Sequence, residues 1–217
     1  GVAQTVRLVR HRLEEYTALG YSSAGDVIEV DGDAVGCIPG DRVACIGLGF
    51  ATHAEYVAVP KNLIAKVPEG VAMDEAAFGA LACIAMQGIR RLGLTPGERV
   101  GVLGLGLIGQ LCVRLLAAMG YQPTGIDLLE ERAAKAREVS GVDAWSTRAT
   151  DSIQRVADLT AGRGLDGVVV CAATRSDDVV NLAFDLCRPQ GRVSVVGDVG
   201  LGLQRQKMYA KELDLRM

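Results

Sequence analysis

The chain has 217 residues, of which 49% are hydrophobic and 23% charged, and its formal net charge is −3. This composition excludes wholesale disorder and a disulfide-knotted fold, and the charge provides no electrostatic footprint for nucleic acid. Glycine is frequent, at 27 residues, while aromatic residues make up only 4%, a balance typical of an α/β protein with many tight turns. We see no membrane span and no signal peptide, and we expect a reduced, cytoplasmic protein.

The first part of the chain predicts a small and irregular β lobe. Residues 1–19 mix basic, acidic and apolar side chains and read as a short amphipathic helix or arm. Short β runs broken by Gly, Pro and Asp then follow at 24–30, 42–46, 54–59 and 64–67. Residues 72–92 predict a helix. Both ends of the chain are abrupt, so we expect this sequence to be a piece of a longer protein.

From residue 93 onward, predicted strands and helices alternate. The strands fall near 99–104, 122–127, 143–147, 166–171 and 191–197, and the helices near 107–119, 130–139, 151–161 and 177–187. Strict alternation indicates βαβ units, and hence a doubly wound parallel sheet with helices on both faces. We therefore predict two domains, a β lobe with its connecting helix at 1–92 and a Rossmann domain at 93–217.

One glycine pattern in the second domain predicts a binding function. An apolar strand ends in Gly104, and Gly106 and Gly109 complete a Gly-x-Gly-x-x-Gly string that opens a helix. In this βαβ context the glycines give a tight turn, room for a pyrophosphate and close helix packing, and the helix N–H groups favour phosphate. The alternative, a tight turn in a generic α/β sheet, is the weaker interpretation.

The next strand ends in Asp127, 23 positions after Gly104. A carboxylate here can accept hydrogen bonds from the ribose hydroxyls of NAD and repels the 2′-phosphate of NADP. Arg132 follows within a helix, where it can reach a ribose hydroxyl. The small residues after two later strands would leave room for the cofactor, although they also suit ordinary loops. The predicted NAD-binding residues are Gly104, Gly106, Leu107, Ile108, Gly109, Asp127, Arg132, Cys171, Ala172, Val196 and Gly197.

Together these features resemble the medium-chain dehydrogenase/reductase family, the family of the zinc-type alcohol dehydrogenases. The β lobe resembles its GroES-like catalytic domain, with the Gly-Asp-Arg-Val run at 40–43, His-Ala-Glu-Tyr-Val at 53–57 and Lys-Val-Pro-Glu-Gly at 66–70. The segments at 19–25 and 209–213 resemble bi-domain bacterial oxidoreductases, in which a second oxidoreductase half follows. The resemblance implies hydride transfer with nicotinamide held between the two lobes, and a homodimer paired through the edge strand near 212.

The zinc ligands of that family do not match. A Gly-His-Glu string is replaced by Gly20, Tyr21 and Ser22, and the third ligand position falls near Leu81. Cys83 lies close by without a partner and is interpreted as a core residue. Because zinc needs three or four such ligands, the resemblance points to an enzyme with no metal. The phenol of Tyr21 could then polarise the substrate, with Ser22 as a relay, unless both are simply structural.

The sequence thus predicts an NAD(H)-dependent oxidoreductase acting on an alcohol/carbonyl pair of a small molecule, and the resemblance adds a sugar-derived substrate as one candidate. Two alternatives remain open. One is an NADPH-type enoyl or quinone reductase, which Asp127 argues against. The other is a dinucleotide-binding module without chemistry of its own.

Overall fold

The computed structural model describes residues 18–32 and 36–217, so most of the helix or arm predicted at 1–19 lies outside the described residues. The chain divides into two compact units, Gly1–Ala80 and Leu81–Met217. This division lies inside a helix, Gly79–Leu92 (α3), whereas the sequence pattern placed the domain boundary after residue 92.

The first unit is built on a small antiparallel sheet in the order β1-β2-β3. Its elements are Ser22–Asp26 (β1), Arg42–Ile46 (β2), a 3₁₀ turn at Lys61–Leu63 (η1) and Ile64–Lys66 (β3). Val43, Cys45 and Ala51 form its buried core. The strand predicted at 54–59 is wrong, because this segment pairs with no strand of the described residues and Tyr56 within it is 75% exposed.

The predicted helix at 72–92 is divided in two, Met73–Ala76 (α2) and α3. The serine side chain of Ser22 provides the physical reason. Its Oγ donates to the carbonyl oxygen of Ala77 at 2.5 Å and accepts the N–H of Ala80 at 3.3 Å. One side chain therefore satisfies two backbone groups that a continuous helix would pair with the N–H of Leu81 and the carbonyl oxygen of Ala76.

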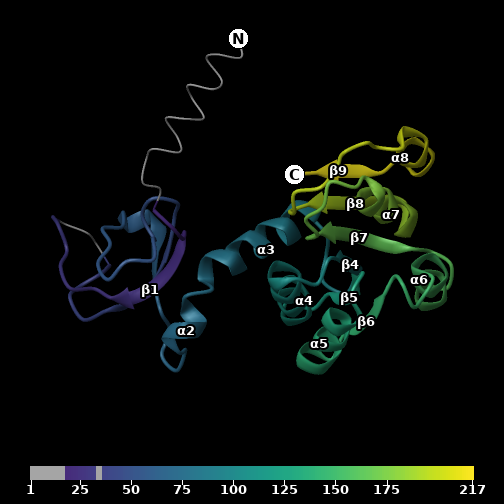
Figure 1. Cartoon of the computed structure of the whole chain (residues 1–217). Helices are drawn as coiled ribbons and strands as arrows, with labels where there is room; N and C mark the ends of the chain where they lie inside the picture. Colours follow the sequence, from purple (N-terminus) through teal and green to yellow (C-terminus); the bar gives the residue numbers. More distant parts are fainter. Residues whose placement is uncertain (1–17, 33–35) are drawn as a thin grey trace, which may run out of the picture. The chain divides into compact units, whose positions relative to one another are not determined.

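The second unit contains a six-stranded sheet in the order β6-β5-β4-β7-β8-β9, in which every neighbouring pair is parallel (Figure 1). Its strands are Arg99–Leu103 (β4), Gln122–Asp127 (β5), Asp143–Ser146 (β6), Leu165–Val170 (β7), Cys187–Val195 (β8) and Asp214–Arg216 (β9). This is the strand order of a Rossmann fold, and it confirms the predicted fold class. The order reverses between β4 and β7, which is where such sheets bind ligands.

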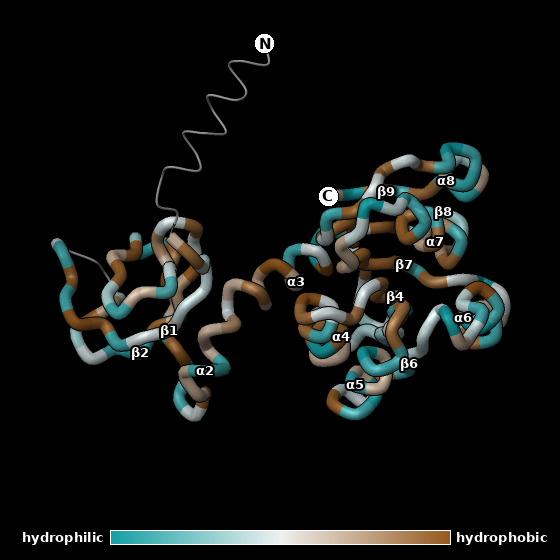
Figure 2. The backbone as a smooth tube through the Cα atoms, in the orientation of Figure 1, coloured by the Kyte–Doolittle hydropathy of each residue, from teal (hydrophilic) through white to brown (hydrophobic). Residues whose placement is uncertain are grey.

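Helices cover both faces of this sheet. They are Leu107–Ala118 (α4), Glu130–Ser140 (α5), Ser152–Thr160 (α6), Asp178–Leu186 (α7) and Arg205–Lys211 (α8). One apolar cluster joins β4 to α3, α4 and α5, and another joins β7 and β8 to α6 and α7. Figure 2 shows the hydrophobic run along β7, which is buried over its whole length. None of the helices in 18–32 and 36–217 is long and apolar enough to span a membrane.

Two arginines, one from β8 and one from the edge strand β9, hold the C-terminal end of α3. Arg192 in β8 donates to the carbonyl oxygen of Leu92 at 2.9 Å and also to that of Gly93. Arg216 in β9 donates to the carbonyl oxygen of Arg91 at 2.8 Å. Because the last carbonyls of a helix have no partner within it, these guanidinium groups satisfy them from outside.

A buried carboxylate ties together the amino ends of three strands. Asp166 in β7 accepts the N–H of Arg99 in β4 at 2.8 Å and Nε of Arg188 in β8 at 2.7 Å. Burial raises the pKa of Asp166, but the hydrogen bonds from Arg188 and from the Arg99 backbone outweigh burial, and the pKa is lowered overall. Its contribution to stability is therefore present above the unfolded pKa, about 4, and is lost as the pH falls through the lower folded pKa.

We expect Asp166→Asn to lower the free energy of unfolding by about 1–3 kcal/mol at pH 7, because two donors lose a charged acceptor. The deficit relative to wild type should shrink as the pH falls below about 4, because Asp166 of the unfolded wild type then takes up a proton before the folded carboxylate does. Urea unfolding of both proteins between pH 7 and pH 3 measures this difference. A deficit that stays constant across the range would contradict the assignment.

Candidate functional site

The glycine-rich loop lies at the carboxyl end of β4 and opens α4. Gly104 has φ +92°, a conformation that favours glycine, and its N–H donates to the carbonyl oxygen of Ile126 at 2.8 Å. Gly106 is the N-cap residue of α4, with φ −66° and ψ −167°, and as a glycine it has no side chain that could cap this end of the helix. The first N–H groups of a helix point outward along its axis, so this end is suited to an anion.

Steric contacts within the protein explain two of the three glycines. A Cβ on Gly104 would lie 2.6 Å from the backbone nitrogen of Ala172, and one on Gly109 would overlap the carbonyl oxygen of Gly104. A Cβ on Gly106, in contrast, would meet no described atom within 4 Å. Gly104 and Gly109 thus allow close packing of the protein itself, whereas Gly106 leaves open space beside the start of α4. This open space fits the pyrophosphate predicted from the sequence.

Asp127 lies at the end of β5 and is 6% exposed. Its Oδ2 accepts the N–H of Leu105 at 2.6 Å, and its Oδ1 accepts the N–H of Leu129 at 2.9 Å. Arg132 Nη1 lies 3.7 Å from Oδ2. The carboxylate therefore supports the glycine-rich loop directly, a role that the sequence did not indicate. Each carboxylate oxygen can accept a further hydrogen bond, so the predicted ribose contact remains chemically available.

Gln110 was missed by the sequence analysis. It is half-buried in the first turn of α4, and its Nε2 donates to the carbonyl oxygens of Leu105 at 3.1 Å and Arg132 at 3.0 Å. The available signal was its place directly after Gly109, the last glycine of the loop. A glutamine on a helix is ordinary, so this signal is weak.

The other predicted cofactor residues gather at the same end of the sheet. The N–H groups of Cys171 and Ala172 donate to the carbonyl oxygen of Leu103 at 2.8 and 3.0 Å. Those of Val196 and Gly197 donate to the carbonyl oxygen of Val170 at 2.9 and 3.0 Å. The carboxyl ends of β4, β7 and β8 are thereby joined. Of the loop residues, Leu107 is 52% exposed and Ile108 packs partly against the core.

The buried thiol of Cys112 lies beside Cys171, one of these residues. The neighbouring Cys171 thiol, together with burial, raises the pKa of Cys112 in α4 well above its usual range. Cys112 is fully buried and is held as the neutral thiol at neutral pH. It therefore packs as a small apolar side chain.

The candidate catalytic residues Tyr21 and Ser22 lie in the first unit. The Tyr21 side chain is 40% exposed, whereas the Ser22 hydroxyl is engaged with the backbone of Ala77 and Ala80. These contacts favour the structural alternative for Ser22. His53 is exposed and its ring lies against Gly20, where a Cβ would overlap it.

The residues present in 18–32 and 36–217 do not form a zinc site. No group of three His, Cys, Asp or Glu side chains in these ranges could hold a metal ion. Leu81, near the third ligand position, is half-buried and provides no donor. The interpretation of Cys83 as a core residue is wrong, because α3 presents this side chain to solvent.

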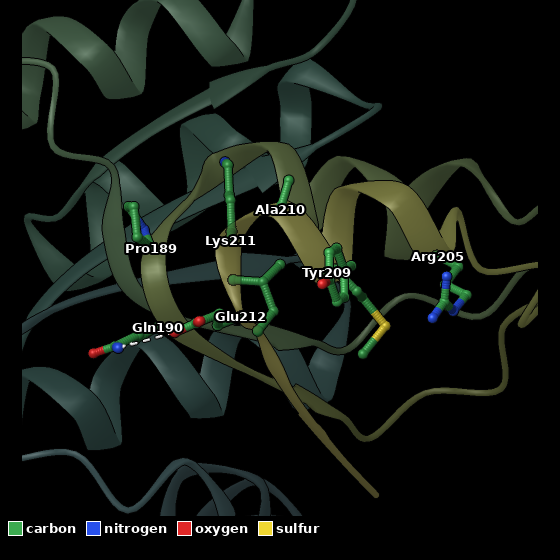
Figure 3. Close-up of a pocket in the computed structure, with 9 residues that line it drawn as sticks. Pro189, Gln190, Arg205, Tyr209, Ala210, Lys211 and Glu212 are labelled. Atoms are coloured by element: carbon green, nitrogen blue, oxygen red, sulfur yellow. Dashed lines mark hydrogen bonds between the residues drawn. The ribbon is translucent and has the colours of Figure 1, made fainter.

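A separate pocket of about 620 Å³ lies along α8 (Figure 3). It is lined by Pro189, Gln190, Arg205, Met208, Tyr209, Ala210, Lys211, Glu212 and Leu213. Gln190 Nε2 donates to Glu212 Oε2 at 3.1 Å across it, and both residues have positive φ angles, +57° and +52°. None of the predicted site residues lines this pocket.

Comparison with known proteins bears on this geometry. Residues 108–216, just over half of the chain, match the model of a family described as zinc-binding dehydrogenase. An alcohol dehydrogenase from Thermus sp. ATN1 is 22% identical, with a TM-score of 0.77 over 98% of this chain and 72% of its own. The 2R,3R-butanediol dehydrogenase from Bacillus subtilis is 24% identical, with a TM-score of 0.81 over 93% of this chain and 65% of its own.

A third structure holds a nucleotide. A protein from Sinorhizobium meliloti 1021, classed as a zinc-binding dehydrogenase and bound to NADP, is 21% identical, with a TM-score of 0.78 over 93% of this chain and 69% of its own. At these identities the structures show a shared fold, and the chain spans 65–72% of their lengths. With the family match and the Rossmann strand order, the chain belongs to the zinc-binding dehydrogenases of the medium-chain dehydrogenase/reductase family, a family of oxidoreductases.

Proposed function

We propose that this chain binds NAD(H) at the loop of residues 104–109 and serves an oxidoreductase acting on an alcohol/carbonyl pair. The observation that carries the proposal is the open space at Gly106, beside an uncapped helix start. The nicotinamide, when bound, supplies the hydride chemistry, and the chain supplies binding and orientation. Family membership supports an oxidoreductase, while the nucleotide and the substrate are our proposals.

The residues of the site have separate tasks in this proposal. The N–H groups of Gly106, Leu107 and Ile108 bind the pyrophosphate, aided by the helix dipole of α4. Asp127 accepts the ribose hydroxyls through lone pairs that Leu105 and Leu129 leave free. The small residues that follow β7 and β8 keep space for the rest of the nucleotide.

We propose NAD rather than NADP because of the charge at Asp127. A buried carboxylate repels the 2′-phosphate, and the next residue, Leu128, brings no cation. Arg132, 3.7 Å from the carboxylate, offsets part of this repulsion. Because one protein of the same fold is bound to NADP, the affinities of this chain for the two nucleotides have to be compared directly.

Isothermal calorimetry with NADH and NADPH at equal ionic strength tests both parts of the proposal. We expect NADH to bind at least about tenfold more tightly, which corresponds to about 1.4 kcal/mol. Tighter NADPH binding would favour the enoyl or quinone reductase alternative. Binding of neither nucleotide would overturn the proposal. NADH binding without turnover of any carbonyl by the full-length protein would favour the non-catalytic module.

The sole tryptophan provides a second readout of binding. Trp145 lies in β6 opposite Ile126, one register position before the Asp127–Ser146 pair. It is 3% exposed, and its Nε1 donates to Ser152 Oγ at 2.9 Å. A fixed, buried indole emits in the range that reduced nicotinamide absorbs. NADH should therefore quench its fluorescence by energy transfer.

We also propose that Tyr21 polarises the substrate carbonyl in place of zinc. The exposure of its side chain and the lack of a three-ligand group in the described residues support this assignment. Tyr21→Phe in the full-length protein should lower kcat by about 10²-fold or more, because a proton donor at the reacting oxygen is lost. Its Kd for NADH should be unchanged. A kcat equal to that of wild type would show that the phenol takes no part.

A further inference from the structure

Gln110 is a polar side chain whose contacts lie entirely within the nucleotide loop and its support. Its Nε2 donates to the carbonyl oxygen of Leu105, between two loop glycines, and to the carbonyl oxygen of Arg132 in α5. Both bonds are near 3 Å, and the side chain is half-buried. A side chain that uses both amide hydrogens on backbone carbonyls of different elements fixes the distance between those elements.

These bonds close a ring with the contacts of Asp127. The carboxylate accepts the N–H of Leu105 and faces the guanidinium of Arg132, while Gln110 binds the carbonyl oxygens of the same two residues. Leu105 is therefore held at its N–H by one side chain and at its C=O by another. The loop, the end of β5 and the starts of α4 and α5 become one connected unit.

The geometry of the peptide bond gives this ring a consequence for phosphate binding. The carbonyl of Leu105 and the N–H of Gly106 belong to one planar trans peptide, so they point in opposite directions. Gln110 holds the carbonyl on its own side. The Gly106 N–H is thereby directed away from Gln110. If this peptide rotated, the Gly106 N–H would no longer point away from Gln110.

We propose that Gln110 is a positioning residue of the dinucleotide site, which orients the peptide between Leu105 and Gly106 so that the Gly106 N–H binds the pyrophosphate. This inference rests on the proposed function and concerns the same site. The role is independent of the 2′-position of the ribose. It therefore affects NADH and NADPH equally and affects ligands without phosphate little.

Gln110→Met tests the inference, because methionine keeps the length and helix propensity of the side chain but removes both donors. The matched control is Gln154→Met in α6, where the side chain of an exposed glutamine donates to Asp158. Calorimetry with NADH, NADPH and adenosine is performed on wild type and both variants. We expect Gln110→Met to raise Kd about tenfold for both dinucleotides and less than about twofold for adenosine. The control should change none of them.

The outcomes separate this inference from the function on which it rests. If wild type binds no NADH, both fall. If wild type binds NADH and Gln110→Met binds it equally well, only the positioning role is overturned. An equal loss for adenosine also overturns it, since that result indicates general disruption of the domain. Should Gln110→Met fail to fold, Gln110→Asn keeps the amide but is too short to reach both carbonyls, and the same dinucleotide-selective loss is required of it.

Discussion

Gly106→Ala should leave the free energy of unfolding within about 0.5 kcal/mol of wild type while weakening NADH binding at least about tenfold. Gly106 has an ordinary backbone conformation, and a Cβ there meets no described atom within 4 Å. The small loss of N-cap preference is offset by the reduced entropy of the unfolded chain. The new methyl group would occupy the space proposed for the pyrophosphate. Urea unfolding and calorimetry measure the two effects separately.

Gly109→Ala is the matched comparison, three residues further along α4. Its Cβ would overlap the carbonyl oxygen of Gly104, so the loop must shift even without ligand. We expect this variant to lose about 1–3 kcal/mol of stability. A Gly106→Ala protein that is equally destabilised, or that binds NADH like wild type, would contradict the assignment of the open space.

Lys211→Met should lower the free energy of unfolding by about 3 kcal/mol, a large effect for a residue to which the sequence assigned no role. The Lys211 ammonium in α8 donates to the carbonyl oxygens of Phe184 at 3.0 Å, Asp185 at 2.8 Å and Cys187 at 2.7 Å. It therefore caps the C-terminal end of α7, where a cation also favours the helix dipole. Methionine fills similar space but leaves three acceptors without a donor.

Lys207→Met in the same helix is the control. Lys207 forms one ion pair, with Asp185 at 2.5 Å, and both side chains are partly exposed. Such a pair contributes at most about 1 kcal/mol, although the change in charge is the same. Thermal unfolding of both variants should show a decrease in Tm several times larger for Lys211→Met. Equal decreases would show that charge, and not the capping of α7, is responsible.

The sequence predicted the βαβ half of the fold well because local and tertiary signals agree there. The strand at 122–127 was placed with its observed bounds, since it lies between two helices and ends at Asp127. The Gly-x-Gly-x-x-Gly string is recognised from its spacing and from the strand and helix on either side of it, although Gly104 also packs against the distant Ala172. Gly104, Gly109 and Asp127 were therefore found at one end of the sheet, as expected.

The rest depended on contacts between distant residues. The break between α2 and α3 requires Ser22, which lies 55 positions before Ala77. The helix α8 was missed, because its polar residues carry no clear apolar period and Lys211 contacts α7, 24 to 27 positions earlier. The bonds of Asp127 and Gln110 to Leu105 join side chains to backbone, which residue patterns do not record.

The capping of α3 sets an order of events during folding. Its last carbonyls are bound by Arg192, 100 positions after Leu92, and by Arg216, 125 positions after Arg91. Because a ribosome delivers the chain from its amino end, α3 is complete long before either arginine exists. The final turn of this helix must fray until β8 and β9 have joined the sheet. Its amide protons should be among the last in the second unit to gain protection from exchange with solvent.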